Sequence, residues 1–299
     1  MVAGQRRLAL SSFLGESAYR IVGAAYIIAL VAVTLFPIWV VVTRSLLPQS
    51  VFLKLSSYPL IPRGLSLEAF ARVFALPQIA GAFLRSVWRT VAGTSLSVAV
   101  TTLAAYAISR RNLPGRRWIL QALVFTLIFW PGLLPTYLMV RTLKMYNTMW
   151  ALVIPGLVDT FYLLVMKAFF ESLSYELEEA AKIDGAGDLQ ILFRIILPLA
   201  IPGILTVGLY IMVGHWNDYF AAMLYLTDPR KRLFNVVLRD MLLAANYNVV
   251  MKSIKLEEQV PPQTAKAAFT ILAALPMVLI YPFVMKYFTR GMMLGAIKG

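Results

Sequence analysis

Long apolar segments dominate this chain. Of its 299 residues, 60% are hydrophobic and only 14% are charged, against about 25% charged residues in an ordinary soluble protein. A helix needs about 20 apolar residues to cross a bilayer. A soluble core of this size would require a much more charged surface. The sequence therefore predicts an all-α, polytopic membrane protein and excludes one large soluble domain.

Six segments approach or exceed the length of a membrane span, and we expect six transmembrane helices. They cover residues 19–42, 83–108, 118–140, 149–170, 193–217 and 264–288. The expected organisation is an N-terminal segment (1–18), a six-span domain (19–290) with a polar loop at 171–196, and a C-terminal tail (291–299). The first span is too long for the apolar core of a signal peptide, so we expect it to stay uncleaved.

Basic residues in the short loops predict the orientation. Arg110, Arg111, Arg116 and Arg117 lie between the second and third spans, whereas the next loop has only Arg141 and Lys144. Because basic loops face the cytoplasm, we expect the arginine-rich loop, the polar loop and both termini on the cytoplasmic side.

The remaining composition excludes several function classes. The net charge of +14 is spread over loops and span ends, without the aromatic-interleaved patch of a nucleic-acid site, and anionic lipid headgroups explain it more simply. The chain has no cysteine and one histidine, so we predict no disulfide, catalytic site or metal site.

Two outer segments contain amphipathic stretches, and several spans contain proline. Ser66 is a predicted N-cap for a short helix, and a second short helix is expected from Phe234 to Leu243. Both could lie on the bilayer or contact a binding protein. Proline kinks a spanning helix where neighbours or water satisfy the freed carbonyl. Such prolines are Pro131, Pro135, Pro155, Pro202, Pro276 and Pro282.

The polar loop has the pattern of a docking element. Ser174 is a predicted N-cap, and the first turns that follow are acidic, which suits the positive end of a helix dipole. Gly185 allows a sharp turn into a second helix. The pattern reads Glu179-Ala180-Ala181-Lys182-Ile183-Asp184-Gly185, then Ile195 and Leu197-Pro198.

This pattern resembles the Glu-Ala-Ala loop of the inner-membrane permeases of ABC importers. Ala105–Arg110, His215–Asp218 and Gly291–Gly299 are similar to the carbohydrate-importer branch, of the maltose permease small-subunit type. Tyr281–Phe288 resembles the oligosaccharide group, which includes aldouronate and alginate importers.

The resemblance implies half of a gated pore in the bacterial inner membrane. Expected partners are a second permease subunit, two ATPase subunits and an extracytoplasmic binding protein. The chain has no phosphate-binding Gly-x-x-x-x-Gly-Lys-Ser/Thr loop, so ATP and Mg are expected on the ATPase subunits. The residues expected to couple to them are Glu178, Glu179, Ala180, Ala181, Asp184 and Gly185.

Several residues are candidates for the substrate path. Asp159 falls near the middle of the predicted fourth span, where an ionisable group indicates a functional site or a structural hydrogen bond. Tyr162, Trp216 and Asn217 could contact a sugar, although Trp and Tyr also anchor span ends at the interface. The single histidine, His215, is expected to hydrogen-bond within the bundle.

Basic residues at outer span ends suggest an acidic oligosaccharide. Arg85, Arg89, Arg141 and Lys144 are expected at the outer entrance, although an acidic binding protein would explain the same charges. The rival function is an ion-coupled secondary transporter, for which only Asp159 and His215 are candidate intramembrane groups.

Overall fold

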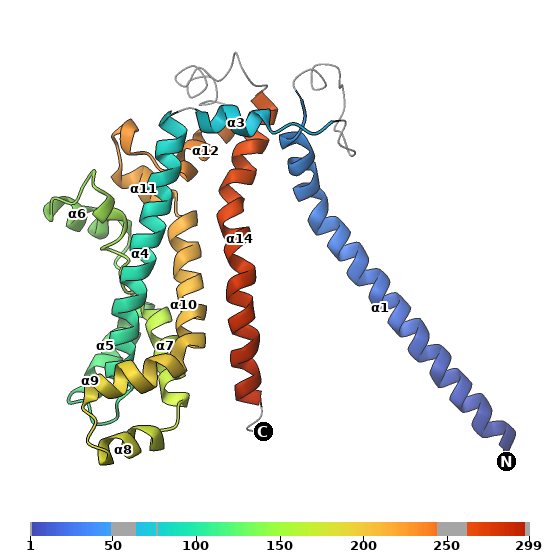
Figure 1. The fold of residues 1–299 in the computed structure, drawn as a ribbon, viewed down its shortest axis with the longest axis horizontal. Coiled ribbons are helices and arrows are strands. Elements are labelled where there is room, and N and C mark those ends of the chain that lie inside the picture. Colours follow the sequence, from blue (N-terminus) through green and yellow to red (C-terminus); the bar gives the residue numbers. More distant parts are fainter. Residues whose placement is uncertain (1, 49–63, 76, 244–261, 297–299) are drawn as a thin grey trace. The chain divides into compact units, whose positions relative to one another are not determined.

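A computed structural model describes residues 2–48, 64–75, 77–243 and 262–296 (Figure 1). The chain divides into two compact units. One comprises Met1–Val73 and Lys255–Ile271, and the other comprises Phe74–Ile254 and Leu272–Gly299. The elements within the described ranges are all helical, which confirms the predicted all-α fold class.

The first unit contains the N-terminal helix α1 (Val2–Ser45), whose apolar part Tyr19–Ser45 is long enough to span a membrane. It also holds most of the short helix α3 (Glu68–Ala75). The Glu68 amide donates to Ser66 Oγ at 3.2 Å, and Arg72 forms an ion pair with Glu68 one turn earlier. Ser66 is therefore the N-cap that the sequence predicts, and α3 is the predicted amphipathic helix.

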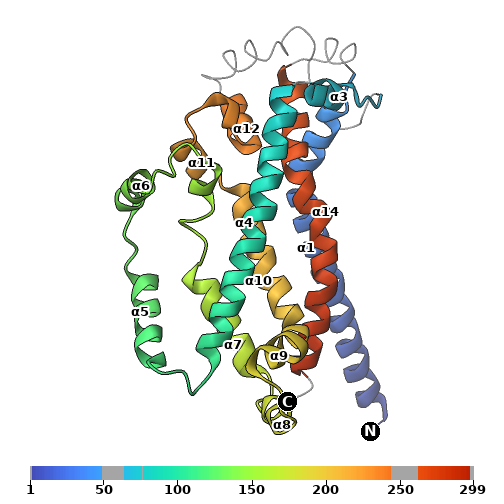
Figure 2. The same ribbon diagram turned by 60° about the vertical axis from the view of Figure 1, so that its left-hand side comes forward.

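Three helices form the centre of the second unit: α4 (Pro77–Ser109), α7 (Thr160–Ser172) and α10 (Leu197–Asn217). Helix α4 packs against both of the others, and Figure 2 shows it running alongside α10. Its 33 residues give a length of about 50 Å at 1.5 Å per residue. Proline occurs only at its first position, so α4 runs without a break.

Small residues let these helices approach closely. A Cβ atom on Gly93 of α4 would lie 2.8 Å from the ring of His215 on α10. A Cβ atom on Gly203 of α10 would lie 2.7 Å from the ring of Phe169 on α7. Helices in membranes associate through such small-residue contacts because lipid supplies no hydrophobic driving force between them.

The third predicted span, 118–140, is broken. Helix α5 (Arg116–Ile128) ends before Pro131-Gly132, and α6 (Leu133–Thr142) continues at an angle of 114° (Figure 2). Gly132 has a φ of 87°, which an L side chain rarely adopts. Proline and glycine together therefore turn the expected kink into a sharp corner.

The fourth predicted span, 149–170, is also discontinuous. A 3₁₀ turn, η1 (Met149–Leu152), leads through the irregular segment 153–159 into α7, which has only 13 residues. Such a helix is about 20 Å long, shorter than the roughly 30 Å of a hydrocarbon core.

Four described helices are long and apolar enough to cross a membrane, or five if α5 and α6 count as one broken span. Besides α1 and α4 they are Asp188–Asn217 and Gln263–Phe283, the latter within α14 (Pro262–Ala296). Pro276 and Pro282 lie inside α14, and Pro202 lies inside α10, without ending the helix.

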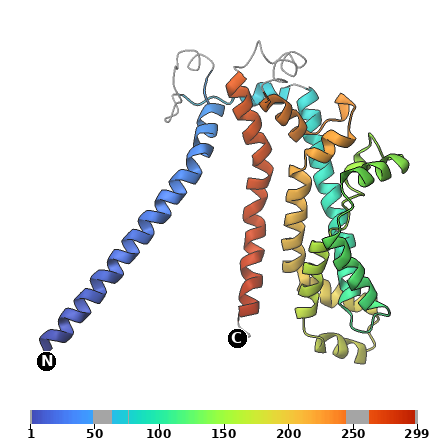
Figure 3. The same ribbon diagram turned by 180° about the vertical axis from the view of Figure 1, so that it is seen from behind.

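Short helices lie at the two ends of the second unit (Figure 3). At one end are α8 (Glu176–Ile183), α9 (Asp188–Ile191) and a π-helical turn, η2 (Leu192–Ile196), that leads into α10. At the other are α11 (Phe220–Tyr225), η3 (Pro229–Lys231) and α12 (Phe234–Leu242), which corresponds to the second predicted amphipathic helix. An apolar cluster from α6, η1, α11 and α12 holds this second end together.

The Gly203 contact gives a first prediction. Gly203→Ala forces a methyl group against Phe169, and overpacking of this kind costs about 1–3 kcal/mol. Gly214→Ala is the matched control, because it lies on the same helix and has open space around its Cβ position. We expect Gly203→Ala to have the lower melting temperature in detergent. Equal melting temperatures would contradict the close α7–α10 contact.

Candidate functional site

The polar loop 171–196, called here the Glu-Ala-Ala loop, begins with α8. Tyr175 is the N-cap of α8 and provides no side-chain cap, so the prediction of a Ser174 cap is wrong. The predicted acidic first turn is present and consists of Glu176, Glu178 and Glu179. These carboxylates stabilise the N-terminal end of the helix through its dipole.

The turn after α8 has a defined hydrogen-bond pattern. Asp184 is the C-cap, the Gly185 amide donates to the Lys182 carbonyl at 3.0 Å, and the Ala186 amide donates to the Ala181 carbonyl at 2.9 Å. This is a Schellman motif, which requires a left-handed residue just past the cap. Gly185 has a φ of 82° and meets that requirement.

Residues of α8 divide between a buried and an exposed face. Glu178 and Ala181 are buried, and Ala181 belongs to an apolar cluster with Ile191 and Ile196 of the same loop. Glu179 and Ala180 are exposed. Of the two alanines expected to fit a partner, only Ala180 therefore faces outward.

The exposed face also carries apolar side chains that the sequence reading did not single out. Ile183 is 86% exposed, and Leu177 and Leu189 are exposed as well. The surrounding loop is polar, so these exposed apolar residues mark a surface that is suited to contact with another protein.

Arg110, directly after α4, makes a contact with this loop that sequence reasoning did not predict. Its guanidinium forms an ion pair with the buried Glu178 carboxylate and lies 4.2 Å from the ring centroid of Tyr106. The sequence marked Arg110 in two ways, through the arginine cluster that gave the orientation and through the stretch Ala105–Arg110, but neither indicated its partner.

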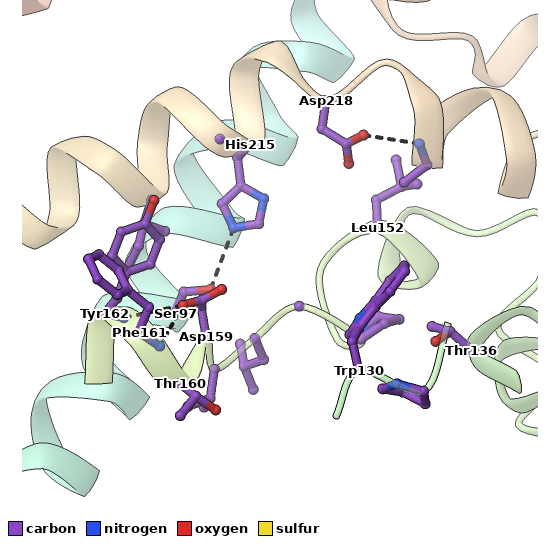
Figure 4. Close-up of a pocket in the computed structure, with 18 of the residues that line it drawn as sticks. Ser97, Trp130, Thr136, Leu152, Asp159, Thr160, Phe161, Tyr162, His215 and Asp218 are labelled. Atoms are coloured by element: carbon purple, nitrogen blue, oxygen red, sulfur yellow. Dashed lines mark hydrogen bonds between the residues drawn. The ribbon is translucent and has the colours of Figure 1, made fainter. Parts of the chain in front are cut away.

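The second candidate site is a cavity of about 1080 Å³ within the second unit (Figure 4). Residues of α4, α5, α6, α7, α10 and α11 line it, together with the irregular segments at Trp130–Pro131 and Pro155–Asp159. Irregular backbone within a spanning region is tolerated only where protein covers it or water reaches it. The irregular segments of this chain therefore lie where protein or a cavity, rather than lipid, can cover them.

Asp159 lies at the edge of this cavity as the N-cap of α7. Its Oδ1 accepts the amides of Phe161 at 2.8 Å and Tyr162 at 3.2 Å (Figure 4). The second oxygen, Oδ2, has no hydrogen bond among the described residues. Asp159 still lies near the middle of the segment 149–170, but that segment is not one continuous helix, because α7 starts directly after Asp159.

Aromatic and polar side chains accompany Asp159 in the cavity lining. Tyr162 of α7 stacks with Tyr210 of α10, with ring centroids 6.2 Å apart and planes at 18°. His215 Nε2 lies 3.5 Å from Ser97 Oγ on the neighbouring helix, as expected for a histidine that hydrogen-bonds within the bundle. Flat rings and hydroxyl groups of this kind can bind a sugar.

Three further residues that the sequence suggested for the substrate path do not line the cavity. Trp216 is buried, and its Nε1 donates to the Ala273 carbonyl at 2.8 Å. Asn217 is the exposed last residue of α10. Arg85 Nε donates to the Arg232 carbonyl at 3.1 Å.

Arg89 lines the cavity but is held by internal contacts. It is 2% exposed, and its guanidinium forms an ion pair with Asp218 at 2.6 Å and a hydrogen bond to the Asp218 carbonyl at 2.7 Å. A buried arginine in such a pair has a structural role, because loss of one partner leaves a buried charge. Among the described residues, no group of three or more His, Asp or Glu side chains could hold a metal ion.

Comparisons with known proteins agree on one family. Residues 97–294 match the family described as "Binding-protein-dependent transport system inner membrane component". The chain is 40% identical to the polygalacturonan/rhamnogalacturonan transport system permease protein YtcP of Bacillus subtilis, over 80% of this chain and 84% of the relative. It is 35% identical to protein LplC of the same organism, over 90% of each chain.

A solved structure has the same fold. The match is to a chain in the crystal structure of a bacterial ABC transporter involved in the import of the acidic polysaccharide alginate. The TM-score is 0.81 at 27% sequence identity, covering 92% of this chain and 98% of the other.

The capping role of Asp159 gives a second prediction. Asp159→Ala removes the cap of α7 and should lower the free energy of unfolding by about 1 kcal/mol. Asp159→Asn keeps a capping oxygen and should stay near the wild type, although its charge is lost. Denaturation in detergent measures both. Equal losses in the two variants would show that the charge, rather than the cap, stabilises this segment.

Proposed function

Because the chain belongs to the family of binding-protein-dependent transport system inner membrane components, we propose that it is the permease subunit of an ABC importer for an oligosaccharide. The family is a component of transport systems and is not catalytic by itself. The chain forms half of the pore, and a second permease subunit completes it.

The observation that carries the proposal is the exposed face of the Glu-Ala-Ala loop. Glu179, Ala180 and Ile183 face outward on a helix whose position is fixed by its buried face and by the turn at Gly185. A small residue between a charge and an apolar side chain suits a cleft on a soluble partner. We assign this face to one of two ATPase subunits, which bind ATP and Mg.

The cavity supports the transport path. Broken helices line it, as in transporters whose binding sites are formed by discontinuous spans. We assign Asp159 Oδ2 and the rings of Tyr162 and Tyr210 to transient contacts with sugar hydroxyls and sugar faces. Trp216 is assigned to helix packing instead.

The localisation follows from the same assignment. We place the chain in the bacterial inner membrane, with both termini, the arginine-rich loop and the Glu-Ala-Ala loop in the cytoplasm, on the basis of the short-loop charges. An extracytoplasmic binding protein then delivers the sugar at the end that carries α6, α11 and α12.

An acidic oligosaccharide such as an oligouronate is the substrate we favour. One relative is named for polygalacturonan and rhamnogalacturonan, and the solved structure for the acidic polysaccharide alginate. Arg141, in the last turn of α6, and Lys144, just after that helix, are exposed and could attract an anionic ligand or its binding protein. Arg85 and Arg89 are less suited, because internal contacts hold both.

Coupling by the Glu-Ala-Ala loop gives a third prediction. In the reconstituted complex, Gly185→Asp strains a left-handed backbone position and Glu179→Lys reverses an exposed charge. We expect both to abolish the stimulation of ATPase activity by sugar-loaded binding protein. The matched controls are Gly187→Asp, where φ is −75° with open space around the Cβ position, and Asp188→Lys, an exposed charge reversal outside α8. Unchanged stimulation in both test variants would contradict the proposal.

Charge selection at the outer end gives a fourth prediction. The double variant Arg141→Gln/Lys144→Gln should reduce uptake of an oligouronate by roughly threefold or more at low salt, with a smaller effect at high salt. Uptake of a neutral oligosaccharide by the same complex is the control. An equal reduction in the uptake of both sugars would contradict the proposal that these two basic residues favour an acidic substrate.

A further inference from the structure

The Arg110–Glu178 ion pair joins two elements that have different tasks in the proposed function. Glu178 is on α8, within the Glu-Ala-Ala loop, and Arg110 directly follows α4. The Glu178 side chain is 5% exposed and that of Arg110 is 19% exposed. A pair so shielded from solvent is screened little by salt and has a restricted geometry.

Aromatic packing fixes the arginine further. Its guanidinium lies over the Tyr106 ring at 4.2 Å, and that ring meets the ring of Phe170 on α7 edge-on at 5.7 Å. Arginine stacks on an aromatic face while it keeps its hydrogen-bond donors in a plane. The orientation of the Arg110 guanidinium is therefore fixed both by the Glu178 carboxylate and by the Tyr106 ring.

Among the residues whose side chains the structure describes, helix α8 has few other attachments to the bundle. Of its eight residues, only Glu178 and Ala181 are buried. Ala181 adds one methyl group to an apolar cluster, which gives little directional restraint. The ion pair is thus a directional contact between α8 and the residue that follows α4.

The N-terminal half of α4 is attached to the helices of the outer end. Arg89 forms its ion pair with Asp218, the residue after α10. Ser86 Oγ accepts the amide of Phe234, at the start of α12, at 2.9 Å. Since α4 has no internal break, a displacement at Arg110 is passed along the helix to these contacts.

Helix α10 offers a contrasting connection. It leaves the Glu-Ala-Ala loop through the π-helical turn Leu192–Ile196, followed by Pro198. Proline gives no amide hydrogen to the preceding turn, and π turns are local irregularities in a helix. This route from the loop can therefore bend, whereas the route through α4 is continuous.

From this geometry we propose that Arg110 and Glu178 are positioning residues that transmit the movement of the Glu-Ala-Ala loop to α4. The inference rests on the proposed function and adds a second route to coupling. The exposed face of α8 binds the ATPase subunit, and the buried face transmits its displacement to the outer end of the pore.

The test uses the reconstituted complex with its partner permease, ATPase subunits and binding protein. We expect Arg110→Gln and Glu178→Gln each to reduce sugar uptake and sugar-stimulated ATPase activity by about tenfold, since each leaves a shielded charge unpaired. Glu178 was expected to couple to the ATPase directly, but it is buried beneath the exposed face assigned to that subunit. Co-purification of the ATPase and its unstimulated activity should therefore stay at the wild-type level. The double variant should lose no more than either single variant, because the two side chains act as one unit.

Matched controls lie beside each residue. Arg111→Gln neutralises the exposed neighbour of Arg110, and Glu176→Gln neutralises an exposed glutamate of α8. Both should keep full stimulation. Full stimulation in the Arg110 and Glu178 variants would overturn the inference, and so would loss of the ATPase from those complexes, because the pair would then serve docking or folding.

A distance measurement keeps the inference testable if the variants fold poorly. The chain has no cysteine, so spin labels can be attached at Glu176→Cys on α8 and Leu103→Cys on the exposed face of α4. The distance between these labels should be the same with and without ATP in the otherwise wild-type complex. A change in that distance would overturn the inference. Absence of sugar-stimulated ATPase activity in the wild-type complex would instead contradict the proposed function itself.

Discussion

Close contact between α4, α7 and α10 determines where the functional residues of the second unit lie. Gly93 admits the His215 ring and Gly203 admits the Phe169 ring, so the helices approach to a distance that larger side chains would prevent. The apolar surface that remains faces outward and suits lipid, which provides no force to hold helices together. Specific small-residue contacts and a few buried ion pairs therefore hold the helices together, as a hydrophobic core does in a water-soluble protein. The cavity, the Glu-Ala-Ala loop and the outer helices are all positioned from this centre.

Local signals account for what the sequence could predict. Long apolar segments indicated the spanning helices α1, α4, α10 and α14. Ser66 predicted the start of α3 through the local capping pattern, although the same pattern failed at Ser174 of the Glu-Ala-Ala loop. The glycine turn of the Glu-Ala-Ala loop was predictable from a local pattern as well. The corner at Pro131-Gly132 was marked as a kink, but its angle of 114° depends on how α6 packs against the outer helices.

The site residues were harder to predict, because their roles depend on partners distant in the sequence. Asp159 looked like a charge in the middle of a span, yet it caps α7, whose start no hydropathy pattern reveals. Trp216 has the chemistry of a sugar platform, but packing buries it. Glu178 and Glu179 are adjacent and identical in type, and only the fold assigns one to Arg110 and the other to the surface. Side-chain direction, rather than residue type, separates these cases.

The irregular backbone at Trp130–Pro131 and Pro155–Asp159 has a consequence for biogenesis. Exposed peptide groups are costly in hydrocarbon, so this side of the chain is compatible with a bilayer only when protein or water covers it. In the proposed two-permease pore, a copy synthesised without its partner would present these segments to lipid. For that proposed pore, balanced production of both chains follows from the same broken helices that line the cavity.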